Sequence, residues 1–226
     1  MSANPIKRVR VWSAGVRLAH WSMALAVLAL LLTGWLMHSA PTIRASALAY
    51  HWIAAYVLLL ALALRLYLLA FGAGAAGWRD CLPVGAQRRA VLEMLRFYFS
   101  FGRSPLPNWY GHNPLWGPIY LLWFLLLALE LVTGFTLHAP YLVAGVSIGA
   151  IHAWVARFIG GLVAAHVAAV FMHDLKGANC DVSAMISGYR YFVIEKPDAP
   201  LLKPGQVLPL DELRKWTPRE TRGRKH

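Results

Sequence analysis

Charged side chains are scarce in this sequence, and acidic ones are the scarcest. Of 226 residues only 14% are charged, and ten are Asp or Glu, whereas 58% are hydrophobic. A soluble domain of this length normally has nearer a quarter of its residues charged. The composition therefore argues against a soluble globular fold.

Cysteine is also rare. Only Cys81 and Cys180 occur, and no C-x-x-C-H motif is present. This excludes covalent attachment of a c-type haem, and no Cys/His cluster has the spacing of a zinc site. Because both cysteines fall in segments that we predict to face the cytoplasm, we expect no structural disulfide.

Four long apolar runs dominate what is present: Leu18–Met37, Tyr50–Phe71, Leu115–Leu137 and Ile148–Phe171. Each is long enough to cross about 30 Å of hydrocarbon. Helices are expected because a lipid-exposed backbone must satisfy its own hydrogen bonds. The first run is too long for a cleaved signal peptide. The predicted fold is all-α, an integral membrane four-helix bundle.

Basic residues alternate between the connections, so the net charge of +12 does not indicate nucleic-acid binding. The basic segments are the stretch before the first run, the 72–114 connection and the tail; the two short connections hold only Arg44. This is the positive-inside pattern. It predicts a bacterial inner-membrane protein with both termini and the long connection in the cytoplasm.

Two cytoplasmic segments are expected outside the spans. Pro83 to Gly102 has one polar and one apolar side, which predicts an amphipathic helix on the membrane surface between spans two and three. Residues 196–226 are basic, contain proline and lack an apolar period, so we interpret them as an extended tail after a 1–195 membrane domain.

Two histidines in the last span share one helical face. His152 and His166 are fourteen residues apart, within about 40° of four whole turns and about 21 Å along the axis. A metal-competent side chain at two depths of a membrane helix suggests a functional pathway. We interpret the pair as ligands of two haems; the alternative is two buried histidines, each with a local hydrogen bond.

The predicted topology then gives two levels of histidine. His51 and His152 begin inward-running helices near the outer face, whereas His20 and His166 lie towards the inner side. Opposed imidazoles in a bundle core are what bis-histidine ligation of haem b needs. His38 and His138 compete for the outer site by depth, but their terminal positions favour propionate or interface contacts.

Other residues would support these groups. The motif T-G-x-x-x-H ends both outward-running spans, and Gly34 and Gly134 in it would let a flat group approach the backbone, or would serve ordinary helix packing. Arg65 lies fourteen residues after His51, on the same face at the inner level. It would pair with a haem propionate or extend to the inner interface.

Two charges lie inside spans three and four at comparable depths. We predict that Glu130 and Arg157 form a buried ion pair, because a charge in hydrocarbon needs a partner. A proton relay through Glu130 is the alternative.

A quinone site is expected near the inner interface. Its candidates by location are His112, Asn113, Tyr110 and Arg17. For His112 and Asn113, within the motif G-H-N-P, a turn and helix cap is the other interpretation, since Pro114 suits a helix start.

The motifs V-R-L-A-H-W, H-x13-R-L-Y, G-H-N-P-L, T-G-F-x-L, H-x13-H-V and S-x-M-x-x-G-Y-R follow in order over roughly Val11 to Tyr191. In these the chain resembles the b-type cytochrome subunits of membrane-bound nickel–iron hydrogenases. The resemblance implies two b haems held by His20, His51, His152 and His166. It also implies electron transfer from a periplasmic hydrogenase, with small and large subunits, to quinone.

Some features depart from that family. The two outer connections are short, Glu130 and Arg157 stand where apolar residues are expected, and the tail is long. The partner could therefore be another oxidoreductase, such as a formate dehydrogenase, a thiosulfate reductase or a heterodisulfide-reductase-like complex. A non-haem four-span transporter or scaffold is the remaining alternative.

Overall fold

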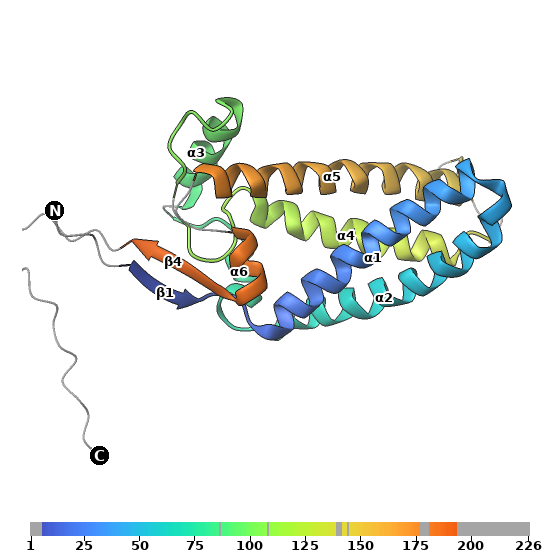
Figure 1. The fold of residues 1–226 in the computed structure, drawn as a ribbon, viewed down its shortest axis with the longest axis horizontal. Coiled ribbons are helices and arrows are strands. Elements are labelled where there is room, and N and C mark those ends of the chain that lie inside the picture. The colour runs from blue at the N-terminus through green and yellow to red at the C-terminus, as the bar shows by residue number, and fades with distance from the viewer. Residues whose placement is uncertain are drawn as a thin grey trace, which may run out of the picture. The chain divides into compact units, whose positions relative to one another are not determined.

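The computed structural model describes residues 6–85, 87–107, 109–138, 142–143, 145–176 and 181–193. Four long helices run alongside one another: α1 (Ala14–Ser39), α2 (Arg44–Phe71), α4 (Trp116–Phe135) and α5 (Ile148–Lys176) (Figure 1). All four are long and apolar enough to cross a membrane. The predicted all-α membrane bundle is therefore confirmed. Cys180 and the predicted tail, residues 196–226, lie outside the described residues.

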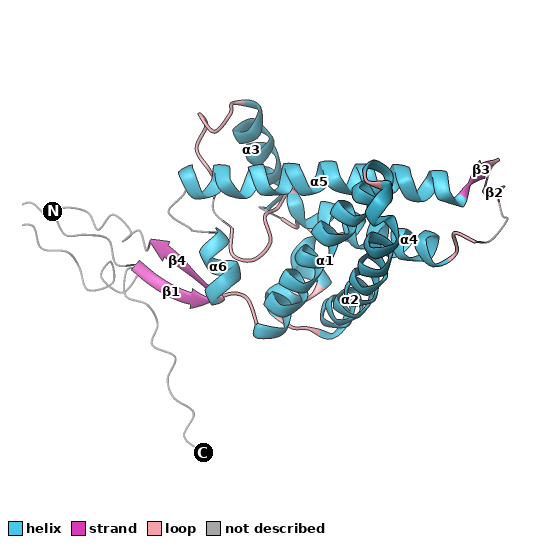
Figure 2. Ribbon diagram, turned by 45° about the vertical axis from the view of Figure 1, so that its right-hand side comes forward, coloured by secondary structure: helices cyan, strands magenta, loops and turns pink. Residues whose placement is uncertain are grey.

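Shorter elements connect these helices (Figure 2). They are the 3₁₀ turns η1 (Pro41–Ile43), η2 (Gly74–Ala76) and η3 (Trp78–Cys81), the helices α3 (Gln87–Phe99) and α6 (Asp181–Ser187), and the strands β1 (Ile6–Arg10), β2 (Leu142–Val143), β3 (Val146–Ser147) and β4 (Tyr189–Val193). Strand β1 pairs with β4, and β2 pairs with β3 in a small antiparallel hairpin.

The apolar core lies midway along the bundle. All four long helices contribute to it: Met23, Ala26 and Val27 from α1, Leu58, Ala61 and Leu62 from α2, Leu127 and Leu131 from α4, and Ile159 from α5. In α5, the core residue Ile159 lies midway between His152 and His166. These two histidines are thus separated by a packed hydrophobic layer.

Several segments gather at the end of the bundle where α1 begins, which we call the inner end after the predicted orientation. The Arg17 guanidinium donates to the Ile186 carbonyl and the Trp21 indole to that of Met185, which joins α1 to α6. Gly188 follows α6 at φ +87°, and a Cβ there would lie 2.8 Å from the Trp12 carbonyl oxygen. Only glycine suits this turn.

The predicted amphipathic helix is present as α3, within the expected 83–102 stretch. It buries Met94 and Phe97 completely, while Leu92 and Phe99 stay 68% and 82% exposed. Exposed apolar side chains beside exposed Arg88, Arg89 and Glu93 are typical of a helix at a membrane surface.

Candidate haem-binding site

His20 and His166, the inner pair, face each other between α1 and α5. Their ring centroids are 6.3 Å apart. Two imidazoles that bind one metal from opposite sides have centroids about 6 Å apart, given a metal–nitrogen bond of about 2 Å. The inner pair therefore has the separation that bis-histidine ligation requires.

A cavity of about 440 Å³ surrounds the inner pair. Its wall is mainly apolar and aromatic, and the ring centroids of Trp116, Tyr120 and Trp123 lie 5.7–5.9 Å from that of His166. His20 Nδ1 is buried without a hydrogen-bond partner among the described residues. A roomy apolar cavity with two convergent imidazoles fits a flat macrocycle such as haem b.

Arg65, which the sequence placed at the inner level, also borders this cavity. This is where a partner of a haem propionate would lie. The Arg65 side chain is buried, donates from Nη1 to the Ala76 carbonyl at 3.0 Å and lies 5.1 Å from the Phe124 ring. The remaining guanidinium donors are available to an anion at the cavity.

His51 and His152, the outer pair, lie at the opposite end. At this end Trp52, the residue after His51, contacts Phe135 of α4, and their ring centroids are 5.5 Å apart. Gly34 faces His51, and Gly134 faces His152 so closely that a Cβ would lie 3.1 Å from its Cε1. The two glycines therefore make room for the imidazoles themselves.

A threonine beside each glycine fixes the tautomer of the neighbouring histidine. Thr33 Oγ1 lies 2.6 Å from the Ala29 carbonyl and 2.8 Å from His51 Nδ1. Because the hydroxyl has one proton, which it donates to the carbonyl, it accepts from Nδ1–H. Nε2 is then left with the lone pair that a metal needs.

Thr133 repeats this arrangement on α4. Its Oγ1 lies 2.9 Å from the Leu129 carbonyl and 3.1 Å from His152 Nδ1. In both copies of the motif T-G-x-x-x-H, the threonine therefore supports a histidine of the outer pair. The sequence pointed to the glycines, whereas the role of the threonines is visible only in the fold, although both stand in the repeated motif.

The predicted Glu130–Arg157 ion pair is wrong. Glu130 Oε1 lies 3.1 Å from His152 Nδ1 instead, and exposed Arg157 lies over the Trp154 ring at 5.2 Å. Arg157 follows His152 by five residues, which turns it about 140° away from the face that meets α4. Equal depth was therefore not enough, because the two side chains lie on different faces.

The quinone candidates divide into two groups. His112 and Asn113 border the inner cavity, whereas Tyr110 and Arg17 are not among its lining residues. His112 bonds Asp80 from Nδ1 at 2.7 Å and from its backbone N–H at 2.9 Å. Asn113 Oδ1 accepts from the Leu115 N–H at the start of α4. Both residues therefore also have the turn and cap roles that the sequence left open.

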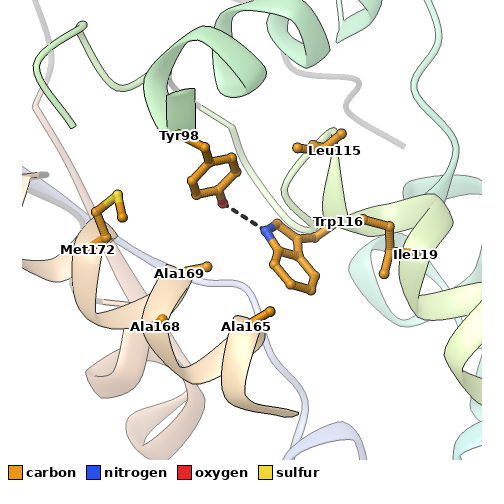
Figure 3. A pocket seen from close by; sticks show the side chains of 8 residues that line it. All are labelled: Tyr98, Leu115, Trp116, Ile119, Ala165, Ala168, Ala169 and Met172. Atoms are coloured by element: carbon orange, nitrogen blue, oxygen red, sulfur yellow. Dashed lines mark hydrogen bonds between the residues drawn. The ribbon is translucent and has the colours of Figure 1, made fainter. Parts of the chain in front are cut away.

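A buried polar chain that the sequence did not indicate adjoins the cavity. The Trp116 indole donates to the Tyr98 hydroxyl (Figure 3). The same hydroxyl lies 2.7 Å from His173 Nε2. His173 Nδ1 lies 3.1 Å from Asp181, which also bonds Arg190. Burial raises the pKa of Tyr98 to about 12, so its hydroxyl remains a donor.

A second hollow, of about 250 Å³, lies on the apolar surface between α4 and α5 at this level (Figure 3). Small side chains, Ala165 and Ala168, leave the space, and Tyr98 borders it. Trp116 and Ala169 line both this hollow and the inner cavity. The two spaces are therefore neighbours.

No three His, Cys, Asp or Glu side chains cluster as a metal site within the described residues. Paired imidazoles suit haem iron, whose other ligands come from the macrocycle. Four membrane-spanning helices with two imidazoles facing each other in an apolar cavity are typical of b-type membrane cytochromes.

Comparison with known proteins agrees with this class. The family model of prokaryotic cytochrome b561 matches residues 11–188. A protein of Cupriavidus necator named "Probable Ni/Fe-hydrogenase B-type cytochrome subunit" is 31% identical over 223 residues, covering 84% of this chain and 90% of the relative. Proteins with that name in Azotobacter chroococcum and, as hydrogenase 1, Escherichia coli K12 are 28% and 25% identical, covering 84% and 80% of this chain and 91% and 89% of their own. No solved structure matches this chain significantly.

The chain belongs to the prokaryotic cytochrome b561 family. It is a b-type cytochrome of a prokaryotic membrane, and its cofactor is haem b. The resemblance to hydrogenase cytochromes that the motifs suggested is thereby confirmed.

Proposed function

We propose that this protein is the membrane subunit of a nickel–iron hydrogenase and passes electrons through two levels of haem b to quinone. The observation that carries the proposal is the facing inner pair, with His51 and His152 on α2 and α5 towards the other end of the same core. The relatives of this chain are named as hydrogenase cytochrome subunits. Haem b would supply the one-electron couple at each level.

The residues of the chain have separate tasks in this function. His51 and His152 would ligate at the outer level and His20 and His166 at the inner level. Thr33 and Thr133 accept from Nδ1–H, which would leave Nε2 of each outer histidine free to hold haem iron. Arg65 would pair with a propionate at the inner cavity.

Electrons would enter at the outer end, from a periplasmic hydrogenase small subunit, and leave at the inner end. The positive-inside pattern supports this orientation, because basic residues of the described chain concentrate at the end with α3 and the start of α1. The hollow between α4 and α5 is the site that we propose for quinone. It is apolar, faces the lipid side of the bundle and shares Trp116 with the inner cavity.

Haem content tests the ligation. The purified protein, reduced with dithionite, should show a b-type α-band and two haems per chain. A chain without that band, or with one haem, would contradict the two-level proposal. Copurification from native membranes tests the partner: hydrogenase small and large subunits are expected, and a different oxidoreductase would replace that part of the proposal.

Filling the hollow tests the quinone site. Ala165→Leu should slow quinone reduction several-fold at unchanged haem content, because its side chain enters the hollow. Ala164→Leu adds the same bulk one residue away, outside the lining of the hollow, and should leave the rate unchanged. Equal rates in both variants would place quinone elsewhere.

A further inference from the structure

Glu130 is a carboxylate in direct contact with one side of the outer pair. Its Oε1 and the Thr133 hydroxyl both lie 3.1 Å from His152 Nδ1. Thr133 donates its own proton to the Leu129 carbonyl, so its oxygen accepts from Nδ1–H. His152 therefore carries its proton on Nδ1, and the Glu130 carboxyl group is the second neighbour of that proton.

The other side of the outer pair has no such group. Thr33 supports His51 as Thr133 supports His152, and each threonine precedes a glycine in the repeated motif. Three residues before Thr133 is Glu130, and three residues before Thr33 is Leu30. The carboxylate is therefore an addition to one half of an otherwise matched arrangement.

Packing does not explain this acid. The Glu130 side chain is 12% exposed, and its Oε2 is buried without a hydrogen-bond partner among the described residues. Arg157 does not neutralise it, as described above. A carboxyl group inside a membrane helix is unfavourable unless it interacts with a functional group, and the group that it contacts is a histidine of the outer pair.

We propose that Glu130 is a positioning residue that acts through His152 to lower the reduction potential of the haem at the outer level. A carboxylate acceptor at Nδ1 draws the proton towards itself and makes Nε2 a stronger donor. A stronger donor favours ferric over ferrous iron, and hydrogen bonding to an axial ligand is one of the means by which proteins set haem potentials. This inference rests on the proposed ligation by the outer pair.

The consequence concerns the direction of transfer. A lower potential at the outer level makes electrons leave it more readily towards the inner level. Arg65, a buried cation at the inner cavity, favours the reduced state there. Glu130 and Arg65 therefore both favour electron transfer from the outer to the inner end.

The test is a redox titration of the α-band in the full-length protein, in its native complex. Glu130→Gln keeps the shape and an acceptor oxygen but removes the charge, and Glu130→Leu gives α4 the residue that α1 has at Leu30. We expect the outer midpoint potential to rise in the Gln variant and further in the Leu variant, with the inner midpoint unchanged. The His152→Ala variant identifies the outer component, because it should lack it.

Two further variants sharpen the test. Leu30→Glu should lower the outer midpoint potential, because it places a carboxylate near His51. Arg157→Gln is the control and should change neither midpoint. The ferric outer haem of Glu130→Gln should also show altered electron paramagnetic resonance g-values, which a role in packing alone would leave unchanged.

The outcomes separate this inference from the proposed function. An unchanged outer midpoint in Glu130→Gln at full haem content, an equal shift of both midpoints, or loss of the outer haem from Glu130→Gln would overturn the role given to Glu130. A wild-type protein with fewer than two haems would instead overturn the two-level ligation on which it rests.

Discussion

The two ends of the bundle hold their histidines by different means. At the outer end, a threonine hydroxyl contacts Nδ1 of each imidazole, and Glu130 also contacts Nδ1 of His152. At the inner end, aromatic edges surround His166, and His20 Nδ1 has no partner among the described residues. The outer pair is oriented by hydrogen bonds and the inner pair by a shaped apolar cavity. Haem at the two levels should therefore respond to different substitutions.

Removing one histidine from each end is the strongest test of this comparison. His166→Ala should remove the inner haem and leave the outer one, and His152→Ala should do the reverse. The reason is that the apolar core separates the two pairs. Each variant is expected to keep about half of the haem, measured by the pyridine haemochrome assay. Loss of all haem from both variants, in protein that still assembles, would contradict independent levels.

Threonine substitutions should affect the outer end alone, and unequally. In Thr33→Val, His51 loses its one side-chain hydrogen-bond partner among the described residues, whereas in Thr133→Val Glu130 still contacts His152. Loss of such a partner typically weakens metal binding about 10–100-fold, so we expect that range for Thr33→Val and a smaller effect for Thr133→Val. Outer haem retention during extraction with a haem-binding competitor measures this. An equal effect of both variants would contradict the claim that Glu130 supports His152.

The glycines of the repeated motif offer a matched steric pair. A Cβ at Gly134 would lie 3.1 Å from His152 Cε1, whereas one at Gly34 would lie 3.8 Å from His51 Cε1. Gly134→Ala should therefore displace its imidazole and shift the outer α-band, and Gly34→Ala should shift it less. The reverse order would show that the space at Gly34 is needed by haem itself.

The smallest effect is expected at the inner end, where Asp80 bonds His112. Burial would raise the pKa of Asp80, but the hydrogen bonds from His112 outweigh it and hold this pKa below its usual range. Ionised Asp80 therefore adds stability above about pH 4, the usual value in an unfolded chain, and this is lost as the pH falls through the folded-state pKa.

Asp80→Ala should lower the free energy of unfolding by about 1–3 kcal/mol at neutral pH, since it leaves buried donors of His112 without an acceptor. The difference from wild type should shrink in acid. Glu93→Ala, an exposed acid on α3, is the control. A difference that stays constant down to pH 3 in thermal unfolding would contradict the role of this carboxylate.

Helical period fixes which residues of one helix share a face, and this is why His152 and His166 could be related from the sequence. The positions of His152 and His166 on continuous α5 agree with that expectation. Partners across helices were harder to predict. Glu130 was assigned to Arg157 by depth alone, and its true neighbour, His152, follows from the rotation of α4 against α5.

The inner end shows the same limit. His173, Asp181 and Arg190 join α5, α6 and β4 through contacts that no periodicity encodes. The motif S-A-M-I-S-G-Y-R marks that segment in the sequence, yet only the fold shows that its arginine is buried and bonds the carbonyls of Trp109, Tyr110 and Gly111.

A potentiometric titration of the b-type α-band in the wild-type protein, repeated on His152→Ala, tests the two-level account most directly. We predict two components of equal amplitude in the wild type, and loss of the lower-potential component in His152→Ala. A single component, or loss of the higher-potential one, would contradict it.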